Sequence, residues 1–240
     1  MRRNRRGSNS GEGRLLARPG TTTERIAPGM HPLGLGDDRD AALYIPEGYQ
    51  PEQPAPFVLS LHGAGGNELS GLYPLQVLAD EFGFILLSPA SRGRTWDVIL
   101  GRFGPDIAFL DRALAATFER CAVDPARIAV SGFSDGASYG LSIGITNGDL
   151  FPNILAFSPG FAVPGPQQGE PRIFVSHGIR DEVLRIDYTS RRVVPVLQDA
   201  GYEVRYREFD GPHTVPGKIA REAVEWFLAG EERASETPAP

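Results

Sequence analysis

The chain has 240 residues, of which 41% are hydrophobic and 22% charged, a composition typical of a globular protein large enough for one α/β domain. No apolar run reaches the ~20 residues of a membrane-spanning helix, and the single Cys121 excludes an internal disulfide framework. The net charge of -6 is uneven: residues 1–20 contain six arginines and one glutamate, so the other 220 residues carry -11. This acidic body argues against a nucleic-acid partner, and four dispersed histidines argue against a metal site.

The two ends of the chain lack the apolar periodicity of a folded domain. Residues 1–20 are polar, glycine-rich and basic, and no apolar segment follows the arginines. This pattern predicts a disordered basic tail rather than a signal peptide, and hence a cytoplasmic protein. An arm that binds nucleic acid or an anionic surface is the alternative. Residues 230–240 are also predicted to be a disordered tail. One folded domain is therefore expected over residues 21–229, and its oligomeric state stays open.

Between these ends, strand and helix patterns alternate. Short β-branched runs predict strands, and apolar residues at helical spacing predict helices. Strands are expected at residues 41–46, 57–61, 84–88, 127–130, 152–157, 172–176 and 202–209, and helices at 69–82, 105–120, 137–145, 188–200 and 218–228. The alternation predicts an α/β fold with a mostly parallel central sheet and helices on both faces.

The most informative motif is Gly132-Phe-Ser134-Asp-Gly136, which lies between a predicted strand and a predicted helix. In a G-x-S-x-G turn the serine has strained backbone geometry and its hydroxyl projects from the strand-to-helix elbow. The flanking glycines allow strand and helix to approach closely. The motif by itself is weak, but this context predicts that Ser134 is a nucleophile.

A serine nucleophile needs a base that accepts its proton. His31 precedes the predicted sheet, His62 belongs to a glycine-rich turn and His177 ends a strand, whereas His213 lies in a loop between the last strand and the last helix. His213 is therefore the predicted base.

In the chain order Ser, acid, His, the acid lies between residues 134 and 213. Asp181 is favoured because it follows the carboxyl end of a predicted strand, where open α/β sheets place functional groups. Glu182 and Asp210 remain rivals.

Acyl transfer also requires donors that stabilise the oxyanion. The backbone amide of Asp135, at the start of the helix, is one candidate. The second is the amide of Ala64, in the glycine-rich loop His62–Gly66. This loop does not fit a dinucleotide-binding fingerprint, because Glu68 stands where the last glycine is required.

Four apolar side chains are expected to line the substrate pocket: Trp96, Tyr139, Phe161 and Leu184. Between the strand ending at Phe157 and the next strand lie only fourteen residues, 158–171, with four prolines and three glycines. Such a segment cannot build a helical lid, so no cap domain is expected.

With these residues in place, the chain resembles the α/β-hydrolase serine esterases, specifically the phospholipase/carboxylesterase (acyl-protein thioesterase-like) group. It is also similar to polyhydroxybutyrate-depolymerase and feruloyl-esterase-like proteins. The matching segments are Leu61–Gly66, Arg127–Gly136, His177–Val183 and Gly211–Pro216. Members of the thioesterase-like group commonly carry Gln at the position of Asp135 and Pro at that of Arg185, so the substrate stays open.

The resemblance implies a carboxylesterase that hydrolyses small-molecule esters through an acyl-enzyme, with Ser134 as nucleophile, His213 as base and Asp181 as acid. It implies no cofactor, no metal, no nucleic-acid partner and no membrane insertion. Short to medium acyl chains are expected, since an open cleft buries little of a long chain. A lysophospholipase or acyl thioesterase is an alternative, and a non-catalytic binding protein of the same fold is an alternative of another class.

Overall fold

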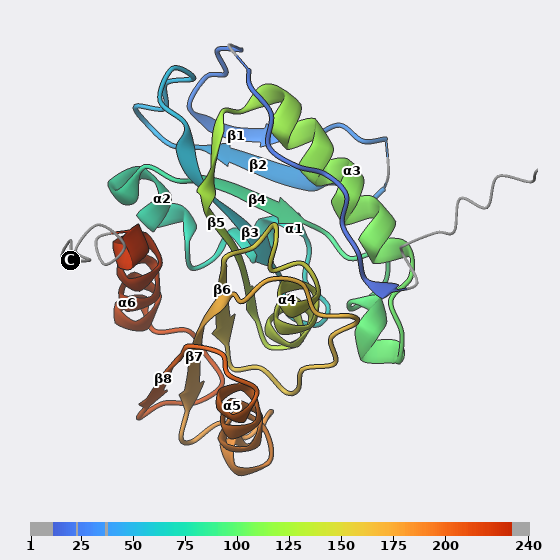
Figure 1. Ribbon diagram of the computed structural model, residues 1–240, viewed down its shortest axis with the longest axis vertical. Helices are drawn as coiled ribbons and strands as arrows, with labels where there is room; N and C mark the ends of the chain where they lie inside the picture. Colours follow the sequence, from blue (N-terminus) through green and yellow to red (C-terminus); the bar gives the residue numbers. More distant parts are fainter. Residues whose placement is uncertain (1–11, 23, 37, 232–240) are drawn as a thin grey trace, which may run out of the picture.

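The computed structural model describes residues 12–22, 24–36 and 38–231, which form an eight-stranded sheet in the order β1-β2-β4-β3-β5-β6-β7-β8 (Figure 1). The strands are β1 (Gly29–Pro32), β2 (Ala41–Ile45), β3 (Ala55–Leu61), β4 (Ile85–Pro89), β5 (Val123–Phe133), β6 (Asn153–Phe157), β7 (Arg172–Gly178) and β8 (Val204–Phe209). The pairings β1-β2 and β2-β4 are antiparallel and all the others are parallel. The expected mostly parallel α/β sheet is therefore confirmed.

Helices cover both faces of this sheet. They are α1 (Glu68–Leu72), α2 (Gln76–Phe82), α3 (Pro105–Arg120), α4 (Asp135–Thr146), α5 (Ser190–Asp199) and α6 (Gly217–Leu228). Side chains alternate along β3, so Phe57, Leu59 and Leu61 join a core with α3, α4 and α5, whereas Val58 joins a core with α1, α2 and α6. The two buried faces explain why the central strands are apolar throughout.

Two local differences from the sequence prediction have simple causes. The helix expected over residues 69–82 is divided into α1 and α2, because Pro74 cannot continue a helix through its ring and missing N–H. The edge strand β1 was not predicted. Its residues alternate between half-buried and exposed positions and include Gly29 and Pro32, so they lack the pattern of a buried strand.

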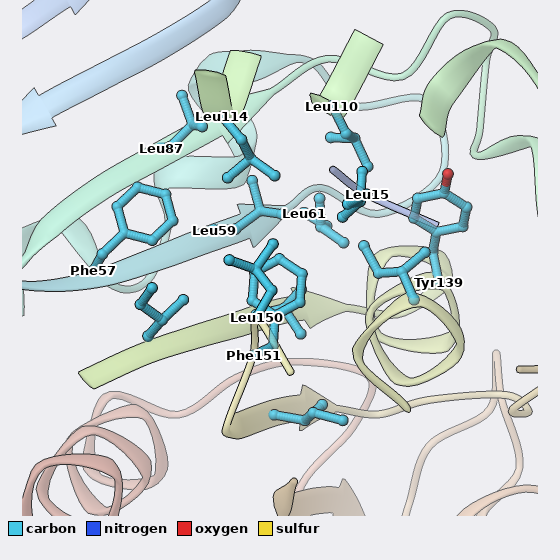
Figure 2. Close-up of a cluster of buried hydrophobic side chains, with 14 of the residues drawn as sticks. Leu15, Phe57, Leu59, Leu61, Leu87, Leu110, Leu114, Tyr139, Leu150 and Phe151 are labelled. Carbon is cyan, nitrogen blue, oxygen red and sulfur yellow. The ribbon is translucent and has the colours of Figure 1, made fainter. Parts of the chain in front are cut away.

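The sequence-based prediction of a disordered tail over residues 1–20 is wrong for residues 12–20. Leu15 is fully buried in the core with Leu110 and Tyr139 (Figure 2). Its backbone N–H donates to Asn147 Oδ1 at 2.9 Å, and Asn147 Nδ2 donates to the carbonyl oxygen of Gly13 at 2.8 Å. The buried Leu15 side chain and these hydrogen bonds hold the segment against the folded domain. The basic composition of residues 1–20 did not indicate this packing. Residues 1–11 and 232–240 lie outside the described residues.

The connection between β6 and β7, residues 158–171, contains no helix or strand and runs beside α4 (Figure 1). It is too short for a cap domain, as expected. The carboxyl ends of β5, β7 and β8 lead into α4 and into the loops around residues 179–185 and 210–216, so these segments meet at one edge of the sheet.

Candidate active site

The turn between β5 and α4 is a sharp elbow. Ser134 has φ 58° and ψ -121°, a conformation that non-glycine residues rarely adopt. A Cβ on Gly132 would lie 2.2 Å from the carbonyl oxygen of Gly136, and a Cβ on Gly136 would lie 2.2 Å from that of Leu61. Both glycines are thus required by close backbone contacts, and the strained residue between them is the predicted nucleophile.

Ser134, His213 and Asp181 form a continuous hydrogen-bonded chain. His213 Nε2 lies 2.9 Å from Ser134 Oγ, and His213 Nδ1 lies 2.5 Å from Asp181 Oδ2. A carboxylate accepts hydrogen bonds only, so Nδ1–H donates to Asp181 and the unprotonated Nε2 accepts the Ser134 hydroxyl. The three residues predicted from separate segments therefore meet in the geometry that a serine nucleophile requires.

The carboxylate of Asp181 is buried and oriented by its own loop. Its Oδ1 accepts the backbone N–H groups of Val183 at 2.9 Å and Leu184 at 2.7 Å. The rival Asp210 is exposed and pairs with Arg180 at 3.2 Å, and the rival Glu182 is exposed. Asp181 is thus the candidate whose carboxylate contacts the His213 ring.

A second histidine, His177, also belongs to this cluster, and sequence reasoning missed it. Its Nε2–H donates to the carbonyl oxygen of Leu184 at 2.7 Å and lies 3.2 Å from Asp181 Oδ2, while its Nδ1 accepts the Ser190 hydroxyl at 2.7 Å. Burial lowers the pKa of His177, because the charged ring would lose its hydration. A neutral, fully buried His177 therefore holds the loop that carries Asp181. Its position at the end of β7, four residues before Asp181, was the available signal.

The loop after β3 also passes close to Ser134. A Cβ on Gly63 would lie 3.5 Å from Ser134 Cβ, so the backbone that leads to Ala64 passes directly beside Ser134. Gly65 N–H donates to the carbonyl oxygen of Arg94 at 2.6 Å, which ties this loop to the segment after β4. The amides of Ala64 and Asp135 thus stand on segments that flank Ser134.

The segment after β4 supports both of these flanking segments. Trp96 Nε1–H donates to the carbonyl oxygen of His62 at 2.8 Å, and the Thr95 hydroxyl donates to Asp135 Oδ2 at 2.6 Å. His62 Nε2 accepts Ser91 N–H at 2.9 Å, and burial lowers the pKa of this ring. The Asp135 side chain, which had no specific role in the sequence prediction, is therefore held by Thr95.

The predicted pocket residues separate into two pairs. Trp96 and Tyr139 are fully buried, and their rings stack with centroids 5.0 Å apart. Their assignment as pocket-lining residues is therefore wrong. They form the core behind the His62–Gly66 loop. The sequence shows that they are aromatic but not how deeply they are buried. Phe161 and Leu184 are half-buried, and a methyl group on Gly160 would lie 3.6 Å from Leu184.

A small pocket of about 110 Å³ adjoins His213. The residues that line it are Leu61, His62, Gly63, Ser70, Tyr73, Phe133, His213, Thr214 and Val215. The centroids of the Phe133 and His213 rings, which both line the pocket, lie 4.6 Å apart. A larger hollow of about 640 Å³, lined by Arg172 and Trp226, is at the opposite ends of β7 and β8 and contains none of the residues above.

Within residues 12–22, 24–36 and 38–231 there is no group of three or more His, Cys, Asp or Glu side chains arranged to hold a metal ion. In the same part of the chain no helix is long and apolar enough to cross a membrane.

Comparison with solved structures defines the class of fold. A CE1 ferulic acid esterase from Anaeromyces mucronatus, solved with ferulic acid, is 17% identical, with a TM-score of 0.63 over 90% of this chain and 97% of that chain. The Bacillus cereus carboxylesterase is 20% identical, with a TM-score of 0.60 over 80% of this chain and 95% of that chain. The chain therefore has the α/β-hydrolase fold.

Comparison with curated sequences is more specific. Feruloyl esterase C of Emericella nidulans is 27% identical over 158 residues, or 62% of this chain and 57% of that protein. A probable feruloyl esterase C of Aspergillus oryzae is 27% identical over 172 residues, or 68% of this chain and 61% of that protein. The chain thus spans about three-fifths of the length of these relatives, and no family model matches it. The expected resemblance to α/β-hydrolase esterases is confirmed.

Proposed function

We propose that this protein is a serine carboxylic-ester hydrolase that works through an acyl-enzyme. The observation that carries the proposal is the hydrogen-bonded chain from Ser134 through His213 to the buried Asp181. The strained backbone of Ser134 and its position between two loops that offer backbone amides support it further. The similarity to feruloyl esterases agrees with ester hydrolysis.

In the proposed mechanism Ser134 Oγ attacks the ester carbonyl carbon while its proton passes to His213 Nε2. The negative charge that develops on the carbonyl oxygen is stabilised by the backbone amides of Ala64 and Asp135. His213 then gives its proton to the leaving alkoxide, which departs as an alcohol. Water, deprotonated by His213, attacks the acyl carbon. The bond to Ser134 Oγ then breaks, His213 returns the proton to this oxygen, and the acid is released. Asp181 holds the His213 tautomer and stabilises the imidazolium.

The substrates proposed are esters of short to medium acyl chains. The pocket beside His213 is about 110 Å³, and His213 protonates the leaving group, so we assign this pocket to the alcohol. The acyl group would then lie on the side of Phe161 and Leu184, which are half-buried. Feruloyl esters form a second candidate class, favoured by the curated relatives. No cofactor is required by this chemistry.

The direct test is labelling with a fluorophosphonate, which reacts with activated serines and not with the serine of a non-catalytic binding protein. Intact mass should increase by one adduct, and peptide mapping should locate the adduct at Ser134. Ser134→Ala should fold normally but take up no label and hydrolyse no ester. An adduct at another serine, or no adduct together with no ester hydrolysis, would contradict the proposal.

The substrate class is tested with p-nitrophenyl esters from acetate to palmitate and with methyl ferulate. Activity should be highest on short or medium chains and should not jump when the substrate forms micelles. A maximum at palmitate with interfacial activation would contradict the open cleft.

A further inference from the structure

Helix α4, which begins immediately after Ser134, carries three buried hydroxyls four residues apart. Ser138, Ser142 and Thr146 are at most 1% exposed. Each hydroxyl donates to the carbonyl oxygen four residues earlier in the chain, at 3.3, 2.7 and 2.7 Å respectively. With a spacing of four residues, all three lie on one face of the helix.

The same three oxygens accept backbone N–H groups from the connection between β6 and β7. Ser138 Oγ accepts Gly160 N–H at 2.9 Å and Ser142 Oγ accepts Val163 N–H at 3.0 Å. Thr146 Oγ1 accepts Gly165 N–H at 2.9 Å. We call this set of hydrogen bonds the hydroxyl ladder. It binds residues 160–165 along the helix, as the path of the loop beside α4 in Figure 1 indicates.

The ladder supplies this loop with hydrogen bonds that a sheet or helix would otherwise provide. Residues 158–171 form no regular secondary structure, so their amides need other acceptors. Removal of one hydroxyl would leave a partly buried N–H without its acceptor, which is costly. The loop is therefore held in one position on α4 rather than free to open and close.

The loop fixed in this way reaches the proposed reaction centre. Its first rung lies one helical turn after the nucleophile, since Ser138 Oγ is 3.3 Å from the carbonyl oxygen of Ser134. Gly160 lies against the Leu184 side chain, whose own backbone N–H is bound by Asp181. Phe161 follows Gly160 and is half-buried. These residues stand on the side assigned above to the acyl group.

We propose that the hydroxyl ladder makes residues 160–165 a rigid acyl wall that sets the acyl-chain specificity of the enzyme. Ser142 and Thr146 act as positioning residues: they do not touch the substrate, but they determine where the wall stands. This inference rests on the proposed esterase function. A loosened wall should admit longer acyl chains at the expense of discrimination, while the machinery around Ser134 stays in place.

The test uses variants that differ by one hydroxyl. Thr146→Val removes the hydroxyl at nearly constant shape, Thr146→Ser retains it, and Ser142→Ala removes the middle rung. Thr117→Val is the matched control, because Thr117 is fully buried in α3 and donates to the carbonyl oxygen of Ala113 at 2.8 Å. The full chain is used throughout, with p-nitrophenyl acetate and p-nitrophenyl decanoate as the two substrates.

The expected readout is the ratio of kcat/KM for acetate to that for decanoate. This ratio should fall about three- to tenfold in Thr146→Val and Ser142→Ala, a factor that corresponds to the loss of one hydrogen bond. It should stay at the wild-type value in Thr146→Ser and Thr117→Val. Hydrogen exchange at Val163 and Gly165 should accelerate in the first two variants alone. If Thr146→Val does not fold, Ser142→Ala provides the same comparison.

An unchanged ratio in Thr146→Val and Ser142→Ala would overturn the inference, even if kcat/KM falls equally for both esters. The ladder would then have a purely structural role. Wild-type protein that hydrolyses neither ester and gives no phosphonate adduct at Ser134 would overturn the proposed function, and this inference with it. The two failures are therefore distinguished by the wild-type protein.

Discussion

The candidate site has two halves that are built in different ways. The elbow half comprises Ser134, its flanking glycines and the loop after β3, where backbones pass so closely that a Cβ has no room. The acid–base half comprises the end of β7 and the loops after β7 and β8. His213 is hydrogen-bonded to Asp181 there, and His177 donates to the carbonyl oxygen of Leu184 and lies 3.2 Å from Asp181 Oδ2. The first half is governed by sterics within a short stretch of chain and the second by polar contacts between distant segments.

This difference indicates how each half should fail. A steric conflict between backbones cannot be relieved by a small side-chain movement, so changes in the elbow half should affect folding. A changed hydrogen-bond partner in the acid–base half leaves the backbone in place and should affect turnover. Substitutions in each half therefore distinguish a loss of folding from a loss of turnover.

The elbow half is tested with Gly136→Ala. The added Cβ would lie 2.2 Å from the carbonyl oxygen of Leu61 and 2.5 Å from that of His62, so the protein should lose most of its stability or fail to fold. Gly140→Ala is the control in the same helix, because its Cβ would be 3.7 Å from its nearest neighbours. That variant should be as stable as wild type or gain up to about 1 kcal/mol from helix propensity. Equal melting temperatures for the two variants would contradict the steric explanation.

The acid–base half is tested with Asp181→Asn. The amide cannot hold the required His213 tautomer, so kcat should fall by about 10⁴ while the fold is retained. Asp210→Asn is the matched control, since Asp210 is exposed and pairs with Arg180. Steady-state kinetics on p-nitrophenyl acetate, with circular dichroism to verify folding, provide the measurement. A larger loss in Asp210→Asn would transfer the role of the acid to that residue.

His177 should have a smaller effect because it acts through Asp181 and Leu184. His177→Gln should lower kcat about 10- to 100-fold by displacing the acid loop, with KM nearly unchanged. The effects of Asp181→Asn and His177→Gln should not be additive in the double variant, since both substitutions change the contact between His177 and Asp181. Full additivity would place His177 outside the acid loop's hydrogen-bond network.

His177 also predicts a pH dependence of stability. Burial lowers its pKa in the folded state, so between that value and its unfolded value near 6.5 the unfolded chain binds more protons. Stability should therefore fall as the pH decreases below about 6.5. His177→Gln should reduce this acid slope in denaturant titrations but not abolish it, because the pKa of buried His62 is also lowered. An identical slope in variant and wild type would contradict the assignment.

The smallest effect is expected outside both halves, at the N-terminal segment that packs beside the C-terminal end of α4. Hydrogen bonding from Arg14 is the main cause that lowers the pKa of Asp149 from 3.8 to about 2. This carboxylate stabilises the fold above its unfolded pKa, and the contribution disappears as the pH falls through about 2. Because Asp149 is 38% exposed, solvent screening limits the effect of Asp149→Asn to about 1 kcal/mol or less at pH 7.

The measurement is the free energy of unfolding at pH 7 and at pH 2, with Asp199→Asn, on the exposed end of α5, as the control. The Asp149 variant should differ from wild type at pH 7 and converge on it at pH 2. A pH-independent difference would mean that the Asn side chain acts by another route than charge.

The candidate site was predictable to the extent that it depends on local sequence and on chain order. The glycines around Ser134 are required because the backbones at this strand-to-helix turn approach too closely for a Cβ, so the motif can be recognised in the sequence alone. The order of the serine, acid and histidine segments follows from the alternation of strands and helices in one parallel sheet. His213 was selected in this way, and the structure brings it within 2.9 Å of Ser134 Oγ.

Burial and mutual contact were not predictable, because they are properties of the packed molecule. Trp96 and Tyr139 are as apolar as pocket residues but lie at 0% exposure behind the loop after β3. Leu15 stands in a basic, glycine-rich stretch, yet one buried side chain and the amide of Asn147 hold it.

The sequence by itself therefore determined the α/β class, the elbow and the order of the candidate catalytic residues, because periodicity and glycine placement act over a few residues. Only the tertiary structure decided the role of His177, the docking of Leu15 and the hydroxyl ladder on α4. Each of these depends on hydrogen bonds or apolar contacts between segments far apart in the chain. Such contacts exist only after the sheet has brought those segments together.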